Sequence, residues 1–227
     1  MPICIVVGGK YPPLGGIIRF GHYPFISAWN DYTPAEWLVL SVRAGGMLLL
    51  SRYALDALPP EAVQPDERQS TAAKRWMNSV VLPHLFSERE RSATLSGPPG
   101  EISVEEGPQP GKLFLFTECD CRVYLDGFSA RRAALSDYAV SRGAFASELT
   151  DENGQPYGRW LLRDGGDKYW QSEFVDETGA LSRMNNPVSG PALRPAVWVN
   201  YQKAEYETGP NDPKKKWSHV LFRDEFF

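Results

Sequence analysis

The chain has 227 residues, 42% of them hydrophobic, and a formal net charge of −4 at pH 7. This length and apolar content suit one folded domain and exclude a disordered chain, because enough apolar surface is present to offset the entropy lost on folding. The acidic balance lacks the concentrated basic surface that nucleic-acid binding requires, and three cysteines are too few for a disulfide-rich secreted domain. We expect a single domain, residues 1–227, without a nucleic-acid partner.

The first nine residues lack the basic start and the apolar length of a signal peptide. No segment approaches the run of about 18 apolar residues that a membrane-spanning helix needs. The sequence therefore predicts no membrane span and a location in the cytoplasm or on a virion.

Apolar, β-branched runs predict the strands of the first half. These runs are residues 3–7, 17–21, 36–42 and 46–51. The last two are joined by Arg43, Ala44 and Gly45, and a short Gly-containing connection between two such runs predicts a β-hairpin.

Helical spacing of apolar residues predicts a helix over 71–80, capped by Ser70 or Thr71, and Ser87 is a cap candidate for a second helix over 87–92. Pro83 is expected to separate the two. Residues 96–111 are rich in Gly and Pro and predict a surface excursion. Residues 129–142 have a helical composition.

The second half contains further short apolar runs that predict strands. These are residues 112–116, 160–162, 169–171, 172–175 and 196–199. Four tryptophans within apolar runs are expected in the core: Trp37, Trp76, Trp160 and Trp198. Arg163 and Arg194 also lie in apolar surroundings, where an arginine must bond a carboxylate or several carbonyls to offset its desolvation. A structural ion pair is expected, with Asp56 or Asp164 as possible partner.

The order of short motifs along the chain resembles that of a bacterial and phage family of unknown function. The motifs include Glu36-Trp-Leu-Val-Leu40, Lys74-Arg-Trp-Met-Asn78, Arg159-Trp-Leu-Leu-Arg163 and Leu193-Arg-Pro-Ala196. The resemblance covers about residues 17–199, and the tryptophan pair usual in that family before Leu-Arg is here Arg159-Trp160.

That family is related to the C-type lectin-like fold, which it shares with formylglycine-generating enzymes and with the variable proteins of diversity-generating retroelements. The resemblance implies an α+β C-type lectin-like fold with short antiparallel strands, two or three short helices and long loops. It implies no activity. Residues 200–227 lie beyond the match, and this C-terminal extension either completes the sheet by pairing with the N-terminal strand or docks on a partner.

In folds of this kind, a loop region between two core segments forms the binding face. Here the region around residues 164–190 is rich in Gly, Asp, Asn, Tyr and Trp, which suit adaptable recognition. The expected ligand-binding residues are Asp164, Asp167, Tyr169, Trp170, Asn185 and Asn186. We expect a non-enzymatic module that recognises a protein or a glycan, and a merely solvated loop is the alternative.

A second hypothesis is a copper-dependent oxidase similar to formylglycine-generating enzymes, with Cys119 and Cys121 holding copper. In those enzymes the cysteines lie late in the fold, whereas this pair lies mid-chain, and residues two apart on a helix face different directions. The three histidines lack zinc-site spacing.

Two tripeptides are similar to motifs of the calcium and sugar site of C-type lectins: Gln64-Pro-Asp66 and Trp29-Asn-Asp31. Their order along the chain is reversed and both lie outside the expected loop, which favours chance similarity. No common enzyme signature is present, so no catalytic residue, metal or cofactor is expected. A third hypothesis is a structural phage component that docks through residues 200–227, and an oligomer is compatible with that role.

Overall fold

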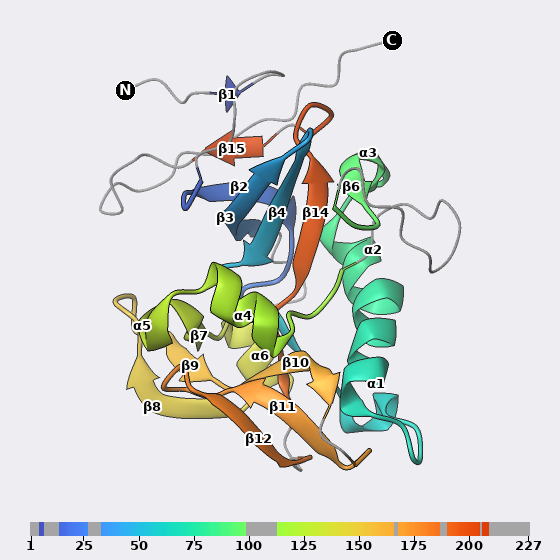
Figure 1. Ribbon diagram of the computed structural model, residues 1–227, viewed down its shortest axis with the longest axis vertical. Helices are drawn as coiled ribbons and strands as arrows, with labels where there is room; N and C mark the ends of the chain where they lie inside the picture. The colour runs from blue at the N-terminus through green and yellow to red at the C-terminus, as the bar shows by residue number, and fades with distance from the viewer. Residues whose placement is uncertain are drawn as a thin grey trace.

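The computed structural model of the chain describes residues 5–6, 14–26, 33–98, 113–165, 168–186, 190–204 and 206–208. These residues form an α+β structure of three mostly antiparallel sheets and six α-helices (Figure 1). In Figure 1, the largest sheet lies above the other two, and α1 and α2 run along one side of the molecule. The α+β class expected from the sequence is therefore confirmed.

The largest sheet has seven strands in the order β1-β15-β2-β3-β4-β14-β6, all antiparallel. The strands are β1 (Ile5–Val6), β15 (Tyr206–Thr208), β2 (Ile17–His22), β3 (Pro34–Arg43), β4 (Gly46–Ser51), β14 (Ala196–Asn200) and β6 (Thr94–Leu95). The predicted hairpin is confirmed as β3 and β4. Its turn places both Ala44 and Gly45 at positive φ, 47° and 88°, as the tight connection of a right-twisted hairpin requires.

Two smaller sheets form the other part of the molecule. The five-stranded one has the order β12 (Leu181–Asn185), β11 (Gln171–Val175), β10 (Trp160–Gly165), β13 (Ala192–Leu193) and β5 (Asp56–Ala57), and the three-stranded one has β7 (Ala133–Ala134), β9 (Pro156–Gly158) and β8 (Ala146–Thr150). Only β10 and β13 pair in parallel among the described strands. The predicted strand at 112–116 is reduced, within the described residues, to one bridge between Phe114 and Ala196.

Strands β4 and β14 are buried on both faces and separate two apolar clusters. Met47 and Leu49 of β4 belong to one cluster, whereas Leu48 and Leu50 face the other. This explains why β4 is a continuous apolar run, since a strand covered on both sides needs no polar face. Three of the four expected core tryptophans are almost fully buried: Trp37, Trp160 and Trp198.

The first predicted helix is longer than expected and contains Pro83. It begins after Arg68 as α1 (Gln69–Trp76), continues through a π-helical turn, η2 (Met77–Val81), and ends as α2 (Leu82–Leu85). Prediction of a break at Pro83 is therefore wrong, because the π-turn directly before Pro83 widens the helix where the proline ring would otherwise clash with the preceding turn. The cap is Arg68 rather than Ser70 or Thr71. A 3₁₀ turn, η1 (Pro60–Ala62), precedes it.

The later helices differ from the prediction in number and position. Helix α3 (Glu88–Ala93) is capped by Ser87, as predicted, in a capping box with Glu90. Residues 129–142 form not one helix but α5 (Gly127–Arg131) and α6 (Asp137–Ser141), separated by β7, because the Ser136 side chain caps a new helix. The sequence also missed α4 (Glu118–Tyr124). Two or three helices were therefore too few.

Several positions that carry sequence-based expectations lie outside the described residues. They include residues 99–112, residue 205, Trp29 and Asp167. Within the part of the chain that is described, no helix combines the length and the hydropathy needed to cross a membrane.

Candidate functional site

Tyr169 and Trp170 are neighbouring aromatic side chains that both face solvent, with 43% and 45% of their surface exposed. With Lys168 they form the turn that leads into β11, here named the aromatic turn (Lys168–Trp170). Their rings meet edge to face, with centroids 4.8 Å apart, and Lys168 Nζ lies 5.9 Å from the centre of the Trp170 ring. Tyr169 and Trp170, the first two residues of the strand predicted at 169–171, therefore form a turn instead. The aromatic turn presents apolar area and a positive charge together.

Asn186 fixes the backbone of the aromatic turn. Its N–H donates to the Trp170 carbonyl at 2.8 Å, and its Nδ2 donates to the Tyr169 carbonyl at 3.2 Å. The hydroxyl of buried Ser172 donates to Asn186 Oδ1 at 2.7 Å, so both ends of the amide are used. Asn186 is predicted to bind ligand, and these bonds show in addition that it positions the backbone of the two aromatic residues.

Asp66 forms a hydrogen bond with the Tyr169 side chain of the aromatic turn. A hydrogen bond between the Tyr169 side chain and the Asp66 carboxylate raises the pKa of Tyr169, because the charged phenolate would lose this bond and be repelled by Asp66. Asp66 has φ of 60° in the loop before α1, a conformation that Asp tolerates better than most residues. The loop before α1 therefore helps to position the Tyr169 side chain through this hydrogen bond.

The other predicted site residues divide into two groups. Asn185 is exposed and pairs with Gln171 at the start of β11, beside the aromatic turn. Asp164 instead lies at the end of β10 and accepts the Glu118 N–H at 3.3 Å, where a carboxylate stabilises the start of α4. Asp167 lies outside the described residues.

Sequence reasoning missed the residues that support the aromatic turn from other elements. Asp66 belongs to the Gln64-Pro-Asp66 tripeptide, whose similarity to a calcium-site motif gives no indication of its bond to Tyr169. Ser172 is buried in β11, and its neighbours in the sequence gave no signal of its hydrogen bond to Asn186. Both contacts join segments that nothing in the local sequence connects.

Cys119 and Cys121 do not form a paired thiol site. Cys119 is exposed and Cys121 is buried, as expected for residues two apart on a helix. Burial raises the pKa of Cys121 to about 12, although the charge of Arg194 opposes the shift, so its thiolate is scarce at neutral pH. No cluster of three His, Cys, Asp or Glu side chains suitable for a metal occurs among the described residues.

Arg163 and Arg194 do not form the ion pairs with Asp56 or Asp164 that their apolar sequence context predicts. Arg163 is exposed, and Arg194 is fully buried but bonds to carbonyl oxygens. Asp56 is bound instead by Tyr23 and Trp76. The apolar sequence context therefore identified the burial of Arg194 and its bonds to several carbonyls correctly, whereas the expected carboxylate partners were wrong.

No protein-family model, curated protein or solved structure matches this chain. Function is therefore inferred from the residues and their contacts.

Proposed function

We propose that the protein is a non-enzymatic binding module that recognises a protein or a glycan through the aromatic turn and Asn185. The observation that carries this proposal is the pair of half-exposed side chains, Tyr169 and Trp170. Asn186 bonds the backbone carbonyls of both residues, and Asp66 bonds the Tyr169 side chain. Trp and Tyr supply large contact areas and dominate the energetics of many interfaces.

The hydrogen bonds that hold the backbone of the aromatic turn support recognition rather than a merely solvated loop. A solvated loop has no need of a buried serine and an asparagine whose amide is used at both ends. Fixing the rings before the ligand arrives lowers the entropy lost on binding. The charge of Lys168 provides a polar contact beside the apolar rings.

We also propose that the chain adopts a C-type lectin-like fold, on the strength of the motif order over residues 17–199. It is supported by the pairing of β1 with β15, which places the first and the last described strands in one sheet. The alternative of docking through residues 200–227 draws less support, because residues 206–208 are engaged in the sheet.

The proposal is tested by replacing both rings, Tyr169→Ala with Trp170→Ala. Purified wild-type and variant proteins are applied to a glycan array and, immobilised, to a lysate whose retained proteins are identified by mass spectrometry. We expect a glycan or protein that binds the wild type to lose about thirtyfold in affinity, as for an interface hot spot. Phe128→Ala is the matched control, since Phe128 is a 60% exposed aromatic residue on α5.

Equal binding by the wild type and the double variant would refute the proposed face. Retention of nothing by the wild type in both formats would count against a binding module.

A further inference from the structure

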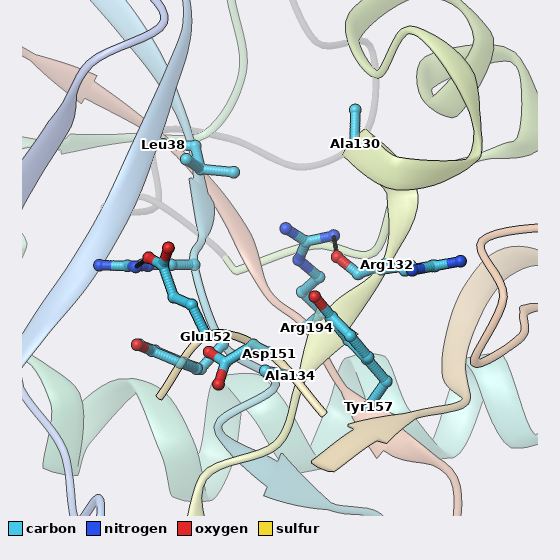
Figure 2. Close-up of a pocket in the computed structure, with 10 residues that line it drawn as sticks. Leu38, Ala130, Arg132, Ala134, Asp151, Glu152, Tyr157 and Arg194 are labelled. Carbon is cyan, nitrogen blue, oxygen red and sulfur yellow. Dashed lines mark hydrogen bonds and ion pairs between the residues drawn. The ribbon is translucent and has the colours of Figure 1, made fainter. Parts of the chain in front are cut away.

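A polar cavity of about 320 Å³ lies between the end of β4, the β8–β9 turn and the segment after β13 (Figure 2). Its wall includes Arg52 and Tyr53 after β4, Asp151 and Glu152 in the turn, and Arg194. None of these residues belongs to the aromatic turn. The volume is at the lower end of the range of small-molecule sites, which begin at about 300 Å³.

Arg194 is a fully buried cation that has no carboxylate partner within the described residues. Its Nε donates to the Ser51 carbonyl at 3.0 Å, and its Nη1 donates to the carbonyls of Arg131 at 3.2 Å and Arg132 at 3.4 Å. Its guanidinium carbon lies 5.1 Å from the centre of the Trp160 ring. Burial lowers the pKa of Arg194 to about 10, so the side chain stays charged at neutral pH.

These bonds leave Nη2 of Arg194 available. Figure 2 shows the guanidinium in the middle of the cavity residues, with one nitrogen bonded to the Arg132 carbonyl and the other terminal nitrogen directed away from it. The Tyr157 hydroxyl points toward Arg194 in the same view and makes no hydrogen bond to the described residues. Two donors therefore converge on the cavity without an acceptor among the described residues.

The other charges of the wall are occupied elsewhere. Arg52 pairs with Glu36 at 2.9 Å and with Glu152 at 3.7 Å. The Asp151 carboxylate accepts backbone N–H groups of its own turn. The Arg132 side chain points away from the cavity in Figure 2 and donates to the Thr178 carbonyl.

We propose that this cavity binds a small molecule carrying one oxyanion group, carboxylate or phosphate, which accepts hydrogen bonds from Arg194 Nη2 and the Tyr157 hydroxyl. A buried charge without a counterion is costly, and an anionic ligand supplies the missing partner. Hydrogen bonds between guanidinium and oxyanion are among the stronger ones in proteins. The Glu152 side chain is 72% exposed, so it can turn into solvent and leave Arg52 as a further donor.

The test uses ¹⁵N-labelled full-length protein titrated with sodium phosphate or with sodium acetate, at ionic strength held constant with sodium chloride. We expect saturable shifts of the amide signals of Ser51, Arg132 and Tyr157 with at least one anion. Response to phosphate alone identifies a phosphate ligand, and response to acetate identifies a carboxylate. Either response supports the site.

Variants separate the site from general attraction of anions. Tyr157→Phe removes one donor and keeps the ring, and we expect it to weaken binding about five- to tenfold. Arg194→Gln is expected to abolish binding. Arg122→Gln removes an exposed charge on α4, 62% exposed in its side chain, and is expected to leave binding unchanged.

The proposal is overturned if neither anion gives a saturable shift up to about 50 mM, because a specific site of this kind binds its ligand more tightly than that. It is also overturned if Tyr157→Phe binds as the wild type does. Because Tyr157→Phe retains the packing of the ring, this outcome can be read even where Arg194→Gln fails to fold.

Discussion

Asp56 is a buried carboxylate that joins three elements through its side chain. Its Oδ2 accepts the Tyr23 hydroxyl at 3.0 Å and Trp76 Nε1 at 3.1 Å, and its Oδ1 accepts the Ala57 N–H at 2.8 Å. Arg142 Nε of the segment after α6 lies 3.8 Å from Oδ1. Burial raises the pKa of Asp56, although these bonds oppose the shift. One side chain thereby links the segment after β2, β5 and α1.

Replacement Asp56→Asn is expected to lower the free energy of unfolding by about 1–3 kcal/mol at pH 4, because an amide nitrogen cannot accept the bonds that the matching carboxyl oxygen receives. The loss depends on pH. The folded-state pKa of Asp56 is raised above its unfolded value, so its contribution to stability is full below the unfolded pKa and falls as pH rises through the folded pKa. Since Asn does not titrate, the difference between wild type and variant should narrow from pH 4 to pH 7.

Urea unfolding of both proteins across that pH range measures this difference. Asp126→Asn is the control, since Asp126 is exposed and makes no side-chain cap bond at α5. A difference that widens with pH would contradict the expected sign.

Among the helices and strands, those with a strong local signal could be predicted and those set by distant contacts could not. Strands β3, β4 and β14 are long apolar runs, and Ser87 with Glu90 is a recognisable capping box. Short strands such as β5 and β13 have two residues each, too few for any periodicity. Tyr169 and Trp170 could be selected from composition, whereas Asp66 and Ser172 depend on contacts that only the folded chain makes.

Helix α4 was missed although Thr117 and Asp120 form a capping box. Thr117 Oγ1 accepts the Asp120 N–H at 3.0 Å, and Asp120 Oδ2 accepts the Thr117 N–H at 2.8 Å.

Because Thr117 caps α4, Thr117→Ala is expected to lower the free energy of unfolding by about 1–2 kcal/mol. Thr71→Ala should change it by less than about 0.5 kcal/mol, because exposed Thr71 lies inside α1 and caps nothing there. Thermal and urea unfolding measure both variants, and a larger loss at Thr71 than at Thr117 would show that the caps are assigned wrongly.

At the scale of the whole molecule, strands far apart in sequence share one sheet. β14 lies between β4 and β6, and β15 lies between β1 and β2. The central strands are covered on both faces by the two apolar clusters, so the sheet and the elements around it are expected to unfold together. The motif order along the chain could indicate a sheet-based α+β domain, but strand order depends on pairings that no local pattern encodes.

The outer part of this sheet gives a test of what the C-terminal segment does. β15 pairs with β2 through Glu207 opposite Arg19 and Thr208 opposite Ile18, and with β1 on its other side. A chain ending at residue 204 loses β15, which exposes the backbone edge of β2 and leaves β1 unpaired. Exposed edges recruit other chains, so we expect this chain to self-associate in size-exclusion chromatography and to lose about 1–3 kcal/mol of stability.

A chain ending at residue 208 is the control, because it keeps the three strands and should match the full-length chain in both measurements. Equal behaviour of the two truncated chains would mean that β15 contributes nothing to the sheet, whereas loss of stability in both would place the stabilising contacts beyond residue 208.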